Sequence, residues 1–274
     1  MIIDAHFHCW QLARGDYGWL TPALAPIYRD VAVDDWRAQA GRCGVQAGVL
    51  VQAAPTEAET AFLLAQAERN DAVLGVVGWA DLLAADAPTR IAHLAAQSKL
   101  KALRPMLHDL PDPGWILQAQ LEPALQAMVD ADLALDALVR PVHLPVLLQL
   151  CRRHPGLRIV IDHAAKPAVA AGQWQPWADA LARLAEQTTA ACKLSGLLTE
   201  AGPAPRADAA RRWARHVLAC FGPSRVLWGS DWPVLELAAT YGDWWDETQA
   251  LLQTCDASQR AAILGDTARQ VYRL

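Results

Sequence analysis

The chain has 274 residues, 53% of them hydrophobic and 19% charged, a balance that is typical of globular proteins and excludes a disordered or fibrous chain. Its 24 lysines and arginines against 29 aspartates and glutamates give a formal net charge of -5, so nucleic acid and anionic membranes are not expected partners. No apolar run approaches the ~20 residues that span a bilayer, and Asp4 stands where a secretory signal carries basic residues, so we expect a cytoplasmic protein.

Short β-branched or aliphatic runs recur along the whole chain, and each predicts a strand buried on both faces because it is apolar nearly throughout. These runs are residues 2–5, 47–52, 73–79, 101–106, 133–139, 158–162, 190–194 and 226–229. Stretches with helical spacing and good helix formers lie between them, among them residues 57–70, 116–131, 144–154, 174–188 and 208–221. Strands and helices therefore alternate.

Eight strand–helix units in a chain of this length favour a (β/α)8 barrel, usually ~250 residues long, over an open doubly wound sheet. No G-x-G-x-x-G or Walker loop follows any of the runs, and no linker interrupts them, so one barrel domain over residues 1–274 is predicted. Residues 11–35, rich in aromatics and prolines, are expected to pack over the barrel mouth. Residues 261–274 are expected to form a last helix or pair of helices that closes the outside.

The active site of a barrel lies at the carboxyl ends of its strands, so the polar residues there matter most. The first strand ends in Asp4-Ala5-His6-Phe7-His8, and the alternation of a strand places Asp4, His6 and His8 on one face. The ends of the later strands supply Arg104, His108, Asp136, Asp162, His163, Lys166, Lys193, Ser195, Ser230 and Asp231.

Two histidines at i and i+2 on a strand end can chelate a metal ion, because a rigid backbone brings both rings to one point. The pair His6 and His8 is a weak signal by itself, and a structural role explains it equally well. His163 and Asp231 arrive at the ends of the sixth and eighth strands, and this coincidence favours a site. A helix cap is the alternative for Asp231.

With these residues in place, the sequence resembles the amidohydrolase superfamily, and within it the lactone-hydrolysing branch of the L-fuconolactonase and L-rhamnonolactonase type. The resemblance spans the chain. It rests on DAHFHCW (4–10), YGWL (17–20), LRPMLHDLPDPGWIL (103–117), LALDALVRPVHLP (133–145), LRIVIDHAAKP (157–167), CKLSGLLTEA (192–201) and VLWGSDWPV (226–234). It implies a somewhat distorted (β/α)8 barrel, hydrolysis of a ring ester, and an active site of His6, His8, His163 and Asp231.

Two-metal members of the superfamily use a carboxylated lysine on the fifth strand, but residues 133–139 contain no lysine, so a bridged two-metal centre is not expected. Two versions of the site stay open. In one, a single divalent ion, Zn2+ by preference, binds His6 and His8, with Asp231 or His163 completing the ligands. In the other, the site works without a metal.

Lactone hydrolysis needs a deprotonated water, a polarised carbonyl and a proton for the departing ring oxygen. We expect Asp231 to accept the proton of the attacking water and to return it to the alkoxide. His6, His8 and His163 are expected to stabilise the oxyanion, directly or through a bound ion. Ser195 lacks a G-x-S-x-G setting, so a serine hydrolase is not expected.

Three polar residues near the mouth are candidates for substrate binding. The planar fork of Arg104 suits paired hydrogen bonds to a substrate oxygen, and a salt bridge to Asp136 or Asp109 is the alternative. Lys166 could reach the substrate or serve the surface. His108 could bind a hydroxyl or pack on its loop.

Twelve tryptophans are present, and Trp10, Trp19, Trp115 and Trp232 fall near the predicted mouth. Aromatic faces pack against the C–H faces of sugar rings, so Trp10 and Trp232 are expected to contact the substrate, with core packing as the alternative. Five others lie in predicted helices and are expected to be structural: Trp36, Trp177, Trp213, Trp244 and Trp245.

A dicarboxylate substrate would need several cations at the mouth, where only Arg104 and Lys166 are placed, so a neutral sugar lactone such as L-fucono-lactone is favoured as the partner. The alternatives are a 2-pyrone-dicarboxylate type of lactonase, a non-oxidative decarboxylase of a cyclic acid, and a barrel that binds a sugar acid without turnover. The oligomeric state stays open.

Six cysteines without a Cys-x-x-Cys pair are expected to be free thiols: Cys9, Cys43, Cys151, Cys192, Cys220 and Cys255.

Overall fold

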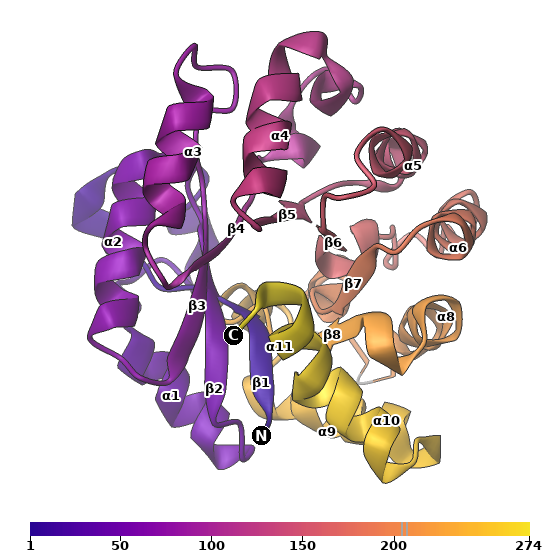
Figure 1. The fold of residues 1–274 in the computed structure, drawn as a ribbon. Helices are drawn as coiled ribbons and strands as arrows, with labels where there is room; N and C mark the ends of the chain where they lie inside the picture. The colour runs from indigo at the N-terminus through magenta and orange to yellow at the C-terminus, as the bar shows by residue number, and fades with distance from the viewer. Residues whose placement is uncertain (204, 207) are drawn as a thin grey trace.

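The computed structural model describes residues 1–203, 205–206 and 208–274, which form one parallel sheet of eight strands in the order β1 to β8. Figure 1 shows these strands as a ring with the helices around it, so the predicted (β/α)8 barrel is confirmed. All eight predicted strands are present. They are β1 (Ile3–Phe7), β2 (Ala47–Val51), β3 (Val73–Gly78), β4 (Leu100–Leu103), β5 (Ala134–Ala137), β6 (Ile159–Ile161), β7 (Ala191–Leu194) and β8 (Val226–Trp228).

The helices follow the predicted alternation, with one clear difference. The prediction of a single helix over residues 116–131 is wrong at its start, because Pro123 is accommodated only in the first turn and α4 therefore begins at Glu122, after short 3-10 turns. The helices are α1 (Val33–Arg42), α2 (Glu57–Glu68), α3 (Ala87–Ala95), α4 (Glu122–Asp130), α5 (Leu144–Arg153), α6 (Trp177–Gln187), α7 (Leu197–Glu200), α8 (Arg211–Phe221), α9 (Tyr241–Leu251), α10 (Ala257–Ala261) and α11 (Thr267–Tyr272).

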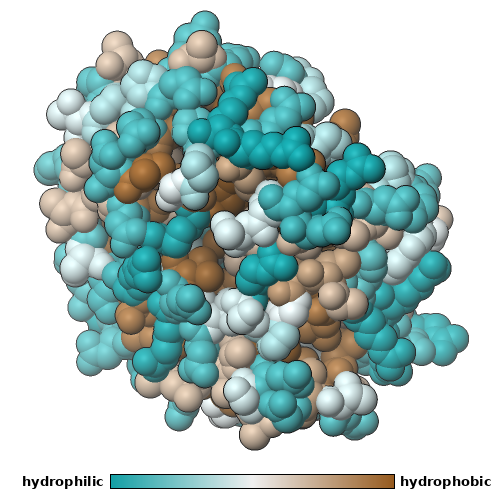
Figure 2. Space-filling model, turned by 45° about the vertical axis from the view of Figure 1, so that its right-hand side comes forward, coloured by the Kyte–Doolittle hydropathy of each residue, from teal (hydrophilic) through white to brown (hydrophobic). Residues whose placement is uncertain are grey.

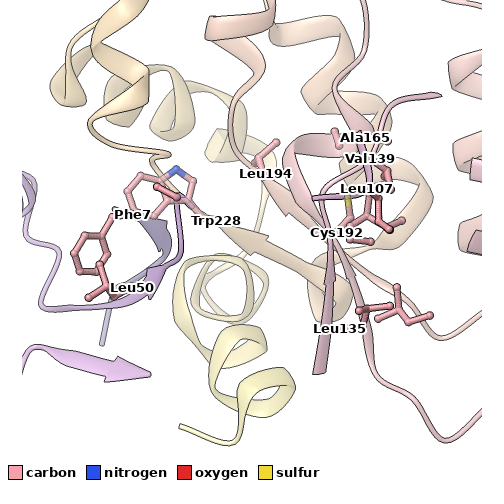
Figure 3. Close-up of a cluster of buried hydrophobic side chains, with 14 of the residues drawn as sticks. Phe7, Leu50, Leu107, Leu135, Val139, Ala165, Cys192, Leu194 and Trp228 are labelled. Atoms are coloured by element: carbon pink, nitrogen blue, oxygen red, sulfur yellow. The ribbon is translucent and has the colours of Figure 1, made fainter. Parts of the chain in front are cut away.

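The strands are apolar on both faces because both faces are buried. Inward-pointing residues such as Val49, Val160 and Leu227 fill the barrel interior. Outward-pointing residues such as Phe7 and Leu50 pack against the helices in a second, larger cluster, part of which is shown in Figure 3. A continuous apolar run is the expected consequence for a strand covered in this way.

Strand β1 carries a bulge that changes the direction of one predicted site residue. Asp4 pairs with Gly48 and Phe7 with Leu50, so β1 uses three residues where β2 uses two. The expectation that Asp4 shares a face with His6 is therefore wrong. Asp4 points outward and accepts hydrogen bonds from Trp36 Nε1 and other groups at the outer helices, whereas His6 points into the barrel.

The barrel closes between β8 and β1 through the segment that follows β8. The N–H of His8 donates to the carbonyl of Trp232, and the N–H of Asp231 donates to the carbonyl of His6, each at 2.8 Å. A single bridge joins Phe7 and Trp232. This closure attaches Asp231 directly to the strand that carries the two histidines.

The C-terminal helix closes the inside of the barrel, not the outside, and this corrects the expectation for residues 261–274. Figure 1 shows α11 over the end of the ring of strands. Tyr272 is fully buried within the interior cluster, and its hydroxyl donates to both carboxylate oxygens of Asp136 at 2.9 and 2.8 Å. Tyr272 therefore forms a floor that separates the interior from solvent.

Hydrophilic residues cover most of the face shown in Figure 2, and hydrophobic residues show mainly in the hollows between them. The outer helices thus direct their apolar sides toward the strands, as a helix packed on a barrel does. Within the part of the chain that the structure describes, no helix has the length and apolar character needed to cross a membrane.

Candidate active site

Four residues from three strand ends form a buried cluster at the carboxyl end of the barrel. His6 and His8 lie on and just after β1, His163 follows β6, and Asp231 follows β8; none is more than 5% exposed. The Nε2 atoms of His6 and His8 are 3.2 Å apart. Oδ1 of Asp231 lies 3.3 Å from Nε2 of His8, 3.6 Å from that of His6 and 3.7 Å from that of His163.

A left-handed turn directs His163 into the cluster. The four residues from His163 to Lys166 all have positive φ, between 49° and 61°, and none is glycine. Each such residue costs roughly 1–2 kcal/mol, and strain of this kind is characteristic of functional sites. The Nε1 of Trp177 donates to the carbonyl of Ala164 at 2.7 Å and holds the turn against α6.

Two glycines make room for the imidazoles. A Cβ on Gly196 would lie 2.8 Å from the Cβ, Cγ and Nδ1 atoms of His163, and Gly196 also has a φ of +67°. A Cβ on Gly229 would lie 2.9 Å from the Cβ of His6. Side chains at these positions would displace the two histidines.

Asp4 positions Asp231 from outside the barrel. Its carboxylate accepts the N–H of Ser230 at 2.8 Å and the Ser230 hydroxyl at 2.6 Å. Burial raises the pKa of Asp4, and the hydrogen bonds from Ser230 and Trp36 oppose that rise. Because Ser230 directly precedes Asp231, we assign Asp4 a role in positioning Asp231. The alternation pattern of the strand did not predict this role, because it placed Asp4 on the face of the histidines.

The partners of each imidazole decide what its other nitrogen can do. Nδ1 of His8 lies 2.7 Å from the carbonyl of Val51, which only accepts, so the hydrogen is on Nδ1 and the neutral ring presents a lone pair at Nε2. Nδ1 of His6 lies 3.0 Å from the Lys193 ammonium, which only donates, so the neutral His6 ring carries its hydrogen on Nε2. Nδ1 of His163 lies 2.9 Å from the Ser195 hydroxyl, which does either, so His163 can present either form.

A buried network of charges lies beneath the cluster. The Lys193 ammonium is 2.5 Å from Asp136 and 2.9 Å from Asp162, and all three side chains are fully buried. Asp162 also pairs with Arg104 at 3.1 Å, so the partner of Arg104 is neither of the two expected from the sequence. Burial raises the pKa of Asp136 to about 6, against the opposing charge of Lys193.

Lys193 has a larger role than its place at the end of a predicted strand indicated. It lies inside the barrel and contacts His6. A signal was present. A lysine within an otherwise apolar strand must be paired if the strand is buried on both faces.

The pKa shifts favour neutral imidazoles beside one carboxylate. Burial, and then the charge of Lys193, lower the pKa of His6 well below its ordinary value. Burial lowers the pKa of His163 to about 4. Burial alone raises the pKa of Asp231, but the neighbouring histidines outweigh it and the net pKa lies below the ordinary value. At neutral pH, Asp231 is therefore ionised.

The cluster fits a single divalent ion. Ligand atoms of His6, His163 and Asp231 lie within 4.8 Å of one another. Nε2 of His8 lies 3.3 Å from the carboxylate oxygen of Asp231 and accepts the N–H at Nε2 of His6 at 3.2 Å, and a cation at this point would take the place of that N–H. His6 is a ligand by distance, but because Lys193 donates at its Nδ1, a cation at Nε2 would have to displace the hydrogen from that atom.

A pocket of about 250 Å³ opens onto this cluster. Six of the residues predicted from the sequence line it: His8, Arg104, His108, His163, Lys166 and Asp231. Trp19 and Met106 also line it, and neither was a predicted binding residue. Buried Nδ1 of His108 has no hydrogen-bond partner among the described residues, so it is available to a ligand. Lys166 forms an ion pair with Glu200.

Trp10 and Trp232 lie behind the pocket wall. Trp10 is fully buried, donates from Nε1 to the carbonyl of Arg29 and contacts Trp19 edge to face, with 5.6 Å between ring centroids. Trp232 is 1% exposed and donates from Nε1 to Glu236. Their positions are suited to supporting the wall, and Trp19 is the aromatic side chain that reaches the pocket.

Comparison with known proteins gives matches over the whole chain. A family model described as amidohydrolase matches residues 3–274. The chain is 48% identical to an L-fucono-1,5-lactonase of Burkholderia ambifaria, covering 99% of this chain and 95% of that protein, and 34% identical to an L-fucono-1,5-lactonase of Burkholderia multivorans, covering 99% and 96%. A crystal structure of a Burkholderia multivorans amidohydrolase with bound zinc superposes with a TM-score of 0.93 at 34% identity, covering 100% of this chain and 99% of that one.

Proposed function

The chain belongs to the amidohydrolase family, and from this premise we propose that it is a lactonase that hydrolyses the ring ester of a neutral sugar lactone, with L-fucono-1,5-lactone as the first candidate. The observation that carries the proposal is that His8, His163 and Asp231 line one pocket, with the fully buried His6 packed against them, in a chain that is 48% identical to an L-fucono-1,5-lactonase. A six-carbon lactone is a reasonable occupant of a pocket of about 250 Å³.

Asp231 acts as the general base and then as the general acid. It is ionised at neutral pH and stands at the centre of the cluster, so it can accept a proton from a water held against the carbonyl carbon of the lactone. The lone pair of His8 Nε2 at 3.3 Å orients the same water. When the tetrahedral intermediate collapses, Asp231 returns its proton to the departing ring oxygen.

The oxyanion is stabilised by donors on the opposite side of the cluster. Lys193 occupies Nδ1 of His6, so the hydrogen of His6 is on Nε2, where it donates to Nε2 of His8 at 3.2 Å. When Nε2 of His8 accepts from the attacking water instead, this N–H is released for the oxyanion. The Arg104 guanidinium lies beside it, with Nη1 3.5 Å from His6 Nε2, and adds a fixed positive charge. Such preorganised donors typically contribute several kcal/mol to stabilising the transition state.

His163 and Asp231, with either His6 or His8, are the residues that would hold a divalent ion, zinc in the first place. Such an ion supplies Lewis-acid polarisation of the carbonyl and lowers the pKa of a bound water. With an ion bound, Ser195 would accept the hydrogen of His163 Nδ1 and so leave the Nε2 lone pair free. In the metal-free state the same hydroxyl donates instead, and His163 offers its N–H to the carbonyl.

The charges around the pocket favour a neutral substrate. Arg104 is engaged by Asp162 and Lys166 by Glu200, so neither cation is free to balance the two carboxylates of a pyrone dicarboxylate. His108 and Lys166 are suited to bind hydroxyl groups of a sugar ring through hydrogen bonds.

We also propose a reducing compartment, the cytoplasm, because all six cysteines are free.

The test is a pH-indicator assay on a panel of aldonolactones with the purified protein, repeated after chelation and after return of zinc. Asp231→Asn keeps the shape but loses the base, so kcat should fall at least ~100-fold. Asp34→Asn is a matched control because that side chain is 82% exposed and lines neither the catalytic pocket nor its neighbouring cavity. Near-normal turnover by Asp231→Asn, or carbon dioxide release in place of acid, would refute the assignment.

A further inference from the structure

A second cavity of about 460 Å³ adjoins the catalytic pocket, over the ends of β2, β3 and β4. We call it the side cavity; Trp19, Trp79, Trp115, Asp16, Asp81 and Asp109 are its characteristic lining residues. It is larger than the catalytic pocket of about 250 Å³, which already accommodates a single lactone ring under the proposed function. A monosaccharide lactone would leave the side cavity empty.

The two spaces share a wall. Trp19, Met106 and Asp109 line both of them, so the two spaces adjoin at these three side chains. Asp109 is held toward His108 of the catalytic pocket, with 3.2 Å between its Oδ1 and His108 Nε2. A group attached to a lactone in the catalytic pocket would have to pass these three side chains to reach the side cavity.

None of the three indoles is buried, and Trp19 is held in place by a hydrogen bond from its ring. Nε1 of Trp19 donates to the carbonyl of Ala53 at 2.7 Å, yet 38% of Trp19 is exposed. The backbone of Trp79 is anchored at both its N–H and its carbonyl by the Thr60 hydroxyl, each at 2.8 Å. Trp79 and Trp115 are both half-buried. Anchored, partly exposed aromatic faces beside a catalytic pocket are surfaces ready for a ring to stack on.

The charged side chains that line the side cavity are all acidic, and they indicate which ligands it suits. Its lining holds three carboxylates, Asp16, Asp81 and Asp109, and within the described ranges no lysine, arginine or histidine lines it. Arg14 pairs with Oδ2 of Asp16 at 2.7 Å, and Oδ1 of Asp16 has no hydrogen-bond partner among the described residues. Carboxylates accept hydrogen bonds from hydroxyl groups and repel anions. Indole faces for the C–H side of a ring, together with carboxylates for its hydroxyls, suit a neutral sugar.

We propose that the side cavity is a subsite for a second, neutral sugar ring, so that the enzyme's substrate class includes lactones of glycosylated aldonic acids. This inference rests on the proposed lactonase function and extends it. The reaction is unchanged: water adds to the lactone carbonyl and the ring ester opens, while the glycosidic bond to the second sugar stays intact.

The test compares L-fucono-1,5-lactone with three derivatives that carry one glucopyranosyl ring at O2, O3 or O4. At least one derivative should have a kcat/KM above that of the bare lactone, by about tenfold if one good aromatic stack forms. The glucuronosyl analogue of the best derivative should lose that advantage, because its carboxylate would face those of Asp16, Asp81 and Asp109. If all three derivatives are slower than the bare lactone, the inference is wrong.

Trp79→Ala and Trp115→Ala separate the subsite from the catalytic pocket, since neither side chain lines the latter. The variant that removes the indole on which the ring stacks should lower kcat/KM for the glycosylated lactone by about tenfold. Both variants should leave kcat/KM for the bare lactone within about twofold, which also shows that they fold. Equal losses on both substrates in both variants would contradict the subsite. Absence of turnover of the bare lactone by the unaltered protein would instead refute the proposed function.

Discussion

Lys193→Met tests whether the buried charge network stabilises the barrel. Lys193 and Arg104 balance Asp136 and Asp162, and none of the four side chains is more than 3% exposed. Removal of the ammonium leaves one unbalanced negative charge in the interior. Breaking a buried pair in this way costs about 3–5 kcal/mol of the free energy of unfolding. Tyr272 still donates a hydrogen bond to Asp136 in the variant, so we expect a loss of unfolding free energy near the lower end, about 3 kcal/mol.

The cost should depend on pH, with a definite sign. Burial already raises the pKa of Asp136 to about 6 in the unaltered protein, and Lys193 opposes that rise. Without Lys193, the folded-state pKa moves further above the unfolded value, so stability falls as pH rises until the higher folded-state pKa is passed. Between pH 6 and pH 8 the variant should therefore lose up to ~1.4 kcal/mol per pH unit relative to the unaltered protein.

Urea unfolding followed by tryptophan fluorescence at pH 6 and pH 8 measures both quantities. The double variant Lys193→Met with Asp136→Asn makes the network neutral again, and it should recover roughly 2 kcal/mol of the loss at pH 8. A single variant that loses less than about 1 kcal/mol at pH 8 would refute the reasoning, given that breaking such a pair is strongly destabilising. So would a double variant whose loss is the sum of the two single losses.

Three further changes test other parts of the structure. Gly196→Ala should lower kcat roughly 10- to 100-fold by displacing His163. Its control is Gly172→Ala, where φ is +63° but nothing lies within 4 Å of the added Cβ, so kcat should be unchanged. Equal kcat values for the two variants would contradict the steric argument. Burial raises the pKa of Glu59 to about 7, so the folded state holds its proton more tightly than the unfolded state, and stability should fall by about 3 kcal/mol as pH rises from 4.5 to 7. Urea unfolding should show this pH dependence lost in Glu59→Gln, and an unchanged slope would count against it. Trp10→Phe should leave KM for the lactone within about twofold but lower the unfolding free energy by about 1 kcal/mol, the worth of one hydrogen bond; a large rise in KM would instead show that Trp10 contacts substrate.

Much of the architecture was predictable because it depends on local patterns. Strands covered on both faces must be apolar throughout, so the eight runs marked the eight strands, and helical spacing between them marked most of the helices. The barrel topology then brought the ends of those strands together. This is why His6, His8, His163 and Asp231 could be named before their distances were known.

The direction of individual side chains was less predictable, because it depends on register and on neighbours far away in the chain. The bulge in β1 turns Asp4 outward, and it is visible only against β2. The helix at the C-terminus packs on the barrel interior, where the hydroxyl of Tyr272 donates a hydrogen bond to Asp136. Both features join residues more than forty positions apart, which no short pattern in the sequence records.

The amino-acid sequence alone determined the barrel, its strand ends and the chemical groups at them, since burial constrains composition one element at a time. The tertiary structure decided what each group does. Lys193 sets which nitrogen of His6 carries the hydrogen, and Trp10 lies behind the wall while Trp19 reaches the pocket. These outcomes depend on distances of a few ångströms between separate strands and loops, and such distances exist only once the whole barrel has closed.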